Sequence, residues 1–281
     1  MVDGLDDRIA AIAGELGLER PTVTVLPGGL LNRTLRLRDA RHDVVLRLAG
    51  AGATALGVDR DAELAMQQLA ASAGLAPAVL LARPAEGLLV TRHVVGRVLT
   101  RDEAREAGML ARIGTWLARL HALAPPAGLE PIDIAARAAG YLQALGPGKS
   151  TALVRDLGRR LARLRGELPP PARLTACHHD LHHFNLVDTS ATVIALDWEY
   201  AGPGDPVADL AACICYQDLD RQQIAILIDS YGGDSRQIAV RLAASVWVFD
   251  CLCYGWIEVA AMQGLATDPE RRRGLIERLT A

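Results

Sequence analysis

Three polar side chains between residues 177 and 199 have the types and the order that phosphoryl transfer needs. Asp180 and Asn185 lie five residues apart between apolar runs, and Asp197 follows the apolar stretch 193–196. Phosphoryl transfer uses a carboxylate that orients the attacking hydroxyl, an amide oxygen on magnesium and a second carboxylate on that metal. Mg2+ prefers such oxygen ligands. The spacing therefore indicates phosphoryl transfer, and the alternative is that the three side chains only cap turns.

The residues around these side chains resemble the motifs of a known family. Residues 178–185 fit the pattern H-x-D-x(4)-N, residues 197–199 read D-W-E, and residues 204–211 fit G-D-P-x-x-D-L-A. These motifs are similar to those of the aminoglycoside phosphotransferase and choline/ethanolamine kinase group. The chain departs from the commonest wording at His183 and Phe184, where Pro and Gly are frequent, and neither is a ligand position.

The resemblance implies roles for four residues between 177 and 199, and this stretch is called the catalytic segment below. Asp180 is expected to be the catalytic base, and Asn185 and Asp197 are expected to hold magnesium. His178 is expected to brace the loop that carries Asp180. The cofactors that the resemblance implies are ATP and Mg2+.

The same resemblance implies a protein-kinase-like fold with two lobes, of the α+β class. Short alternating or β-branched runs between residues 22 and 92 surround one long helical stretch at 59–73, which predicts a small antiparallel sheet with one main helix. We expect an N-terminal nucleotide-binding lobe in residues 1–95 and a C-terminal catalytic and acceptor-binding lobe in residues 96–281. Apolar residues at helical spacing make the second lobe mostly helical, with helices expected at 101–122, 132–145, 150–167, 206–231 and 236–263.

A glycine turn in the first lobe is a candidate phosphate-binding site. Gly28 and Gly29 lie between two expected strands and close to Asn32. Glycine allows the backbone N–H groups of such a turn to approach phosphates closely. A plain hairpin turn is the alternative for the glycine pair.

Arg47 is the candidate cationic ligand for the nucleotide phosphates. It lies at the inward end of the third expected strand, where a protein kinase has its phosphate-binding lysine, and kinases of the choline type often have arginine there. Glu63, on the following helix, is the expected ion-pair partner, and a surface role is the alternative for both. Residues 89–96, which include Thr91 and His93, are expected to link the lobes and meet the adenine.

An acceptor-binding face is predicted on the long apolar helix near the C-terminus. Trp247, Asp250, Tyr254 and Glu258 fall within an arc of about 80° on a helical wheel. Two acids and two aromatic rings on one face suit an organic cation, through charge attraction and cation–π contact. Glu199 is also expected to bind the acceptor. The alternative is an ion-pairing face packed against arginines elsewhere in the chain.

The expected acceptor is a small cationic alcohol. Residues 197–202 and 255–258 resemble choline/ethanolamine kinases and bacterial thiamine kinases most, and both kinds of enzyme have such an acceptor. We therefore expect an ATP-dependent phosphotransferase that moves the γ-phosphate to the hydroxyl of this alcohol. An aminoglycoside or amino-sugar kinase is the first alternative. A nucleotide-binding pseudokinase that acts as an interaction module is the alternative of another class.

Composition argues against a nucleic acid or a membrane as a partner. The formal net charge of −3 gives no bulk field that attracts polyanions. The apolar segment 245–262 carries two carboxylates, which are costly within a bilayer, so it predicts a buried helix. The N-terminus has no basic region of a signal peptide, and five cysteines fit reduced thiols, so a cytoplasmic location is expected. The oligomeric state and the choice between ATP and GTP stay open.

Overall fold

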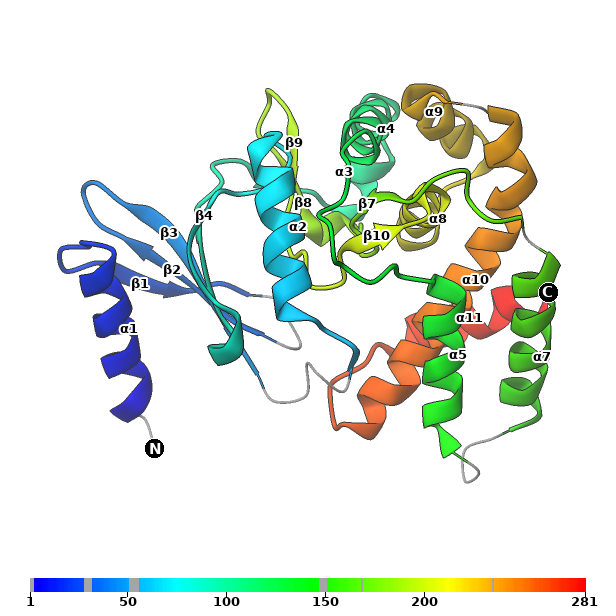
Figure 1. Cartoon of the computed structure of the whole chain (residues 1–281), viewed down its shortest axis with the longest axis horizontal. Helices are drawn as coiled ribbons and strands as arrows, with labels where there is room; N and C mark the ends of the chain where they lie inside the picture. Colours follow the sequence, from blue (N-terminus) through cyan, green and yellow to red (C-terminus); the bar gives the residue numbers. More distant parts are fainter. Residues whose placement is uncertain (1–2, 28–31, 51–55, 147–150, 168, 234) are drawn as a thin grey trace.

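The chain folds into a sheet-containing lobe and a larger helical lobe, which lie side by side (Figure 1). This computed structural model describes residues 3–27, 32–50, 56–146, 151–167, 169–233 and 235–281. The two-lobed, protein-kinase-like α+β fold predicted from the sequence is confirmed.

An antiparallel sheet dominates the first lobe. Its side chains alternate between the two faces, because neighbouring residues of a strand point to opposite sides; in β3 (Asp43–Ala49) the buried residues are Val44, Leu46 and Leu48. In the described residues the sheet has five strands in the order β1-β2-β3-β5-β4. Besides β3, the elements around this sheet are β1 (Thr22–Val25), β2 (Asn32–Arg38), β4 (Val79–Arg83), η2 (Pro84–Glu86) and β5 (Leu88–Arg92).

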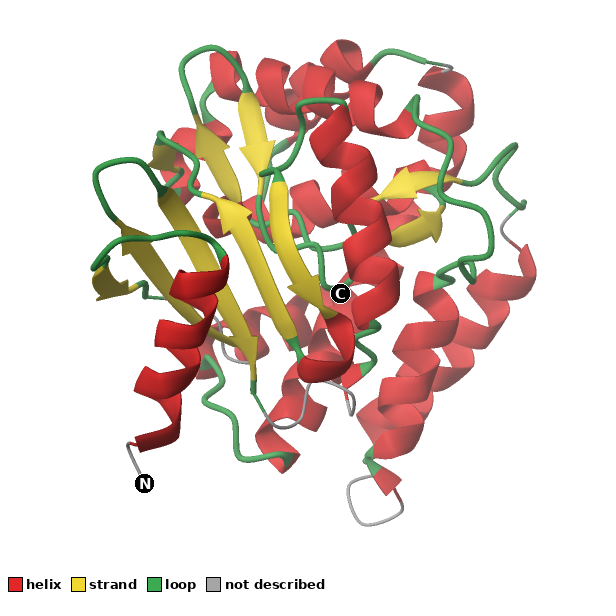
Figure 2. Cartoon of the chain, turned by 60° about the vertical axis from the view of Figure 1, so that its left-hand side comes forward, coloured by secondary structure: helices red, strands yellow, loops and turns green. Residues whose placement is uncertain are grey.

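Helix α1 (Asp3–Glu15) packs against this sheet (Figures 1 and 2). Ile9 and Ile12 belong to the same buried cluster as Leu37 and Val90 of the strands. The first lobe therefore has a hydrophobic core of its own.

Helix α2 (Arg60–Ser72) connects the two lobes. It begins after Asp59, whose carboxylate accepts hydrogen bonds from two backbone amides of the first turn and so satisfies donors that a helix leaves free. Met66 of α2 is fully buried in a cluster that also contains Trp116 and Trp198 of the second lobe. The position of α2 relative to the catalytic segment is therefore fixed by core packing.

The second lobe consists of helices with two small sheets between them. Strands β6, β8 and β9 form one sheet, and β7 and β10 form the other. In chain order its described elements are β6 (Arg97–Val98), α3 (Arg101–Arg105), α4 (Ala107–His121), α5 (Ile134–Ala144), α7 (Ala152–Glu167), β7 (Thr175–Cys177), η3 (His183–Asn185), β8 (Leu186–Asp188), β9 (Val193–Ala195), β10 (Gly202–Gly204), α8 (Pro206–Gln217), α9 (Arg221–Tyr231), α10 (Ser235–Met262) and α11 (Pro269–Thr280).

Two predicted helices are each divided in the structure. The helix predicted at 101–122 breaks at Glu106, whose backbone is extended with φ −62° and ψ 138°. The helix predicted at 206–231 ends at Asp218, with a left-handed φ of 54°, and a new helix begins after the N-cap residue Asp220. Apolar periodicity missed both breaks because the residues on each side continue to face the core.

Helix α11 was not predicted. Its sequence is strongly polar, and its buried residues are Leu275 and Leu279, with 1% and 3% of their surface exposed. Asp268 caps its first turn, and Pro269 occupies the first helical position, where its missing N–H is not needed.

Helix α10 is the most apolar long element. By length and composition, its residues 238–262 would suffice to cross a membrane. In the structure 56% of the most apolar window is buried inside the protein, where α10 packs against α5, α8 and α11. This is the packing of a core helix.

Candidate active site

The catalytic segment brings Asp180 and Asn185 into direct contact. The side-chain Nδ2 of Asn185 donates to the backbone oxygen of Asp180 at 2.9 Å and to its Oδ2 at 3.1 Å. The backbone oxygen of Asn185 accepts a hydrogen bond from the amide of Leu196 at 2.8 Å. The segment with Asp180 and the segment that ends in Asp197 are therefore joined side by side.

His178 connects the same two segments. Its Nε2 lies 2.9 Å from the backbone oxygen of Leu196, and its Nδ1 accepts from the amide of Asp180 at 3.3 Å. The imidazole also packs on the ring of Trp198, with centroids 4.6 Å apart. Burial lowers the pKa of His178, although nearby carboxylates oppose this, so the ring is neutral near pH 7.

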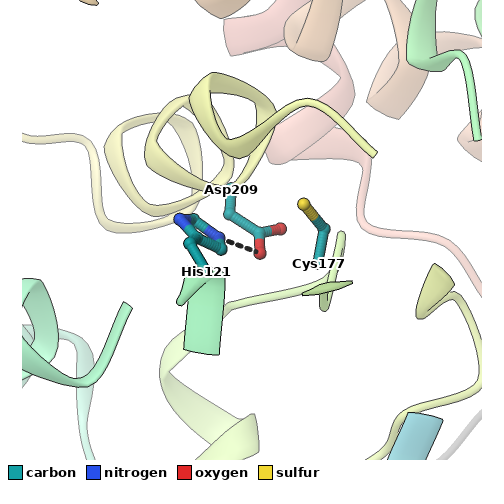
Figure 3. A group of neighbouring side chains, drawn as sticks. All are labelled: His121, Cys177 and Asp209. Carbon is teal, nitrogen blue, oxygen red and sulfur yellow. Dashed lines mark hydrogen bonds and ion pairs between the residues drawn. The ribbon is translucent and has the colours of Figure 1, made fainter. Parts of the chain in front are cut away.

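The carboxylate of Asp209 in α8 accepts hydrogen bonds from the backbone of the catalytic segment. Its Oδ2 accepts from the amide of His178 at 2.8 Å, and its Oδ1 accepts from the amide of His179 at 2.6 Å. His121 lies 3.1 Å from Oδ2 through Nε2 (Figure 3). These hydrogen bonds hold the pKa of the fully buried Asp209 at about 2, against the effect of burial.

His121, Cys177 and Asp209 are close enough to one another to suggest a metal site (Figure 3). The other ring nitrogen of His121 lies 3.0 Å from the hydroxyl of Tyr231, so both of its nitrogens have partners. Burial raises the pKa of Cys177 well above its usual value, and a metal needs the thiolate. His121 and Asp209 form a hydrogen-bonded pair that orients the catalytic segment, and Cys177 lies beside them.

Arg47 of β3 lies between Glu63 and Asp197. Its Nη1 donates to Oδ1 of Asp197 at 2.8 Å, and its Nη2 forms the predicted ion pair with Glu63 of α2. Burial raises the pKa of Asp197, and the charge of Arg47 opposes that rise. Asp197 has a left-handed φ of 57°, which turns the chain directly after the apolar strand β9.

Arg60 belongs to the same network and was missed in the sequence. It donates to Glu63 at 2.8 Å, to Glu199 at 3.3 Å and to Oδ1 of Asn32 at 2.9 Å. Asn32 in turn donates to Glu199 at 2.8 Å. Burial and the charge of Asp197 raise the pKa of Glu199 to about 8. Glu199 therefore contacts predicted nucleotide-side residues, although the sequence placed it with the acceptor.

Two of the remaining predicted nucleotide residues, Thr91 and His93, lie in β5 and directly after it. Thr91 is buried in β5, and the amide of His93 donates to the backbone oxygen of Asp43 at 2.9 Å. Gly28 and Gly29 lie outside the described residues. A contact with adenine or phosphate at these positions stays a prediction.

Tyr216 of α8 contacts the predicted base and was also missed in the sequence. Its hydroxyl donates to Oδ1 of Asp180 at 2.6 Å. The rings of His182 and Phe249 meet the Tyr216 ring edge to face, with centroids 5.4 and 5.3 Å away. Tyr216 therefore closes the side of Asp180 that faces away from Asn185.

The predicted acceptor face on α10 is already occupied by arginines of this chain. Arg278 forms two hydrogen bonds with Asp250, of 2.8 and 2.7 Å, and Arg272 pairs with Glu258. The guanidinium of Arg160 lies 4.4 Å from the ring centroid of Trp247, and that of Arg272 lies 5.9 Å from the centroid of Tyr254. These contacts match the ion-pairing alternative that the sequence left open.

The fold and this arrangement of residues define the class of protein-kinase-like phosphotransferases. A family model named the phosphotransferase enzyme family (APH) matches residues 22–241. The chain belongs to that family.

Curated thiamine kinases are similar to part of the chain. The thiamine kinase of Salmonella typhimurium strain LT2 is 39% identical over 107 residues, which cover 36% of this chain and 37% of that protein. The thiamine kinase of Salmonella paratyphi B is 38% identical over the same length. The chain thus matches little more than a third of the length of these relatives.

Solved structures of kinases and antibiotic phosphotransferases share the whole fold. A choline/ethanolamine kinase family protein from Mesorhizobium loti has a TM-score of 0.82 and 26% identity, covering 98% of this chain and 93% of that one. Choline kinase LicA from Streptococcus pneumoniae has a TM-score of 0.82 at 19% identity, covering 98% and 99%. A macrolide 2'-phosphotransferase type I has a TM-score of 0.67 at 19% identity, covering 100% and 98%. The last two show a common fold alone.

Proposed function

We propose that this chain is an ATP- and magnesium-dependent kinase that phosphorylates the hydroxyl of a small organic alcohol. The observation that carries the proposal is the direct linkage of Asp180 and Asn185 to the segment of Asp197, with Arg47 bound to Asp197. Membership of the phosphotransferase enzyme family supports it independently.

The residues at this site fit a magnesium ion. Asn185 uses its Nδ2 on Asp180, so its amide oxygen is the atom left for a metal. Burial raises the pKa of Asp197, because a charged carboxylate is costly in a buried place. A bound cation beside it would lower that cost. Asn185 and Asp197 would hold the ion as hard oxygen ligands. Magnesium, when bound, neutralises charge on the phosphate oxygens.

Asp180 acts on the acceptor in this mechanism. Its carboxylate is held by Tyr216 on one oxygen and by Asn185 on the other, which fixes its direction before the acceptor arrives. As the acceptor oxygen forms a bond to the γ-phosphorus, the bond to the bridging oxygen breaks and ADP leaves. Asp180 accepts the hydroxyl proton. Such a general base contributes on the order of 100 to 10,000-fold to the rate.

Arg47 acts on the nucleotide. The ion pair with Glu63 holds its guanidinium at the inward end of β3, as the lysine–glutamate pair does in protein kinases. Arg47 would bind a phosphate oxygen of the nucleotide while Glu63 keeps its guanidinium in place. Arg60 positions Glu63, Glu199 and Asn32 around it.

The acceptor in this proposal is a cationic alcohol of the thiamine or choline kind. Support comes from the similarity to thiamine kinases in part of the chain and to a choline/ethanolamine kinase family protein over its length. Five unpaired cysteines fit the reducing cytoplasm, where ATP is also available.

An acceptor screen tests this function. Purified protein with MgATP is incubated with thiamine, choline, ethanolamine and an aminoglycoside, and each product is analysed by mass spectrometry. The proposal predicts one alcohol that gains the mass of a phosphoryl group at a rate well above ATP hydrolysis alone. Nucleotide binding without phosphorylation of any acceptor would favour the pseudokinase alternative.

A further inference from the structure

Arg271 of α11 reaches the neighbourhood of the proposed base. Its guanidinium carbon lies 4.6 Å from the ring centroid of Tyr216, and its Nη2 lies 3.8 Å from Sγ of Cys253. Tyr216 is the residue that donates to Asp180 at 2.6 Å. One aromatic ring therefore separates a positive charge from the carboxylate that would deprotonate the acceptor.

The charge of Arg271 has no carboxylate partner among the residues that the structure describes. Its neighbours on α11 differ in this respect, because Arg272 pairs with Glu258 and Arg278 pairs with Asp250. Arg271 is an exposed residue as a whole, while its guanidinium lies against the Tyr216 ring. It is thus a cation without a carboxylate partner in the described part of the chain, and it lies against the ring whose hydroxyl contacts Asp180.

The backbone of Arg271 is held in place. Leu275 and Leu279 anchor α11 in the core, and Asp268 caps the first turn by accepting from the amide of Arg271 at 3.2 Å. The two ion pairs to α10 add further attachments. The backbone of Arg271 is therefore fixed near Asp180, where the acceptor is proposed to react, and only its side chain is free to adjust.

Resting on the proposed function, we infer that Arg271 is the residue that selects the acceptor by the position of its positive charge. A guanidinium already lies over the Tyr216 ring, where a cation beside the reacting hydroxyl would gain cation–π contact. In choline and ethanolamine the charged nitrogen is close to the hydroxyl. The charge of the acceptor and the charge of Arg271 would therefore both lie beside the Tyr216 ring. Like charges repel more strongly in a protein cleft than in water.

Alcohols of the thiamine kind avoid this conflict. In thiamine the charge is spread over an aromatic ring, and the ring nitrogen lies further from the hydroxyl. Such an acceptor can present its hydroxyl to Asp180 while its cationic part lies away from Arg271. The selected class is therefore an alcohol without a compact cation next to the reacting hydroxyl.

The test measures choline binding by calorimetry, in the presence of magnesium and a non-hydrolysable ATP analogue. Arg271→Met keeps an unbranched apolar stem and removes the charge, and we expect it to bind choline at least tenfold more tightly than the wild type. Arg271→Lys keeps the charge and should bind choline as weakly as the wild type does. Arg273→Met is the matched control, because Arg273 is an exposed arginine of the same helix, and it should leave choline affinity unchanged.

Several outcomes would overturn the inference. Equal choline affinity of the wild type and Arg271→Met, or binding to neither, would remove Arg271 from acceptor selection. A gain of the same size in Arg273→Met would show a general effect of net charge. Arg271→Gln replaces Arg271→Met if the latter has a lower melting temperature. The assay needs no turnover, so a failure of the kinase proposal appears separately, as absence of phosphorylated product.

Discussion

The hydroxyl of Tyr216 donates a hydrogen bond of 2.6 Å to Oδ1 of Asp180. Burial raises the pKa of Tyr216 well above its usual value, so the phenol stays protonated and keeps its role as donor. A hydrogen bond to a charged group is among the stronger ones in proteins. The orientation of the proposed base therefore depends on a residue of α8, outside the catalytic segment.

Tyr216→Phe tests this dependence. The variant keeps the ring and loses the donor, so the carboxylate of Asp180 becomes less well oriented. A hydrogen bond to a charged group contributes about 1.5–3 kcal/mol, and we expect kcat to fall roughly tenfold with the KM for ATP unchanged. Steady-state kinetics with the best acceptor measures both. An unchanged kcat would mean that Tyr216 has no positioning role.

Asp197→Asn should weaken magnesium-dependent nucleotide binding. The substitution removes a charged metal ligand and the partner of Arg47. We expect the affinity for MgATP to fall much more than the affinity for ATP measured in EDTA. Calorimetric titration with and without magnesium gives both values. Equal losses under the two conditions would argue against a magnesium role for Asp197.

Asp250→Asn distinguishes the two interpretations of the α10 face. Only 3% of the Asp250 surface is exposed, and Arg278 loses its partner in the variant. We expect the free energy of unfolding to fall by about 1–3 kcal/mol, with the acceptor KM unchanged. Urea denaturation and acceptor kinetics measure the two effects. A raised acceptor KM at unchanged stability would instead restore the cation pocket proposed from the sequence.

His179 should make stability sensitive to mild acid. It is buried, neither ring nitrogen has a hydrogen-bond partner in the described structure, and burial lowers its pKa from 6.5 to about 4. Between these values the unfolded chain binds a proton that the folded chain does not, so stability is lost as the pH falls. The expected loss is about 3 kcal/mol.

His179→Gly is the matching variant. The backbone of His179 has a left-handed φ of 63°, which glycine adopts without strain. We expect the variant to lose less stability between pH 6.5 and pH 4 than the wild type does, as measured by urea denaturation at each pH. Parallel pH profiles of the two proteins would contradict this explanation.

The sequence predicted the two-lobed fold through the family resemblance of residues 178–211, and local patterns agreed with it. Strand alternation and helical periodicity placed the sheet and α2, and the spacing of Asp180, Asn185 and Asp197 placed the catalytic segment. The pairing of Arg47 with Glu63 was expected from the likeness to the lysine–glutamate pair of protein kinases, and the structure contains it.

The acceptor side was harder to predict because its contacts come from elements far apart in the chain. Tyr216 and Arg271 are separated by more than fifty residues, and neither belongs to a motif that points to Asp180. Helix α11 is too polar for its periodicity to be recognised, so the sequence did not show which arginines would pair with Asp250 and Glu258. The role of Asp209 could have been found from the sequence. It is a single acid within the apolar sequence of α8, and such a residue indicates a buried carboxylate with several partners.

The most direct test of the account compares phosphoryl transfer by the wild type and by Asp180→Asn. Product formation from MgATP and the best acceptor is followed by mass spectrometry, and nucleotide affinity is measured in parallel. We expect the variant to lose on the order of 100 to 10,000-fold in rate while MgATP affinity stays within a factor of about two, because Asp180 acts on the acceptor. A variant that keeps more than about a tenth of the wild-type rate would contradict the proposed role of Asp180 as the base.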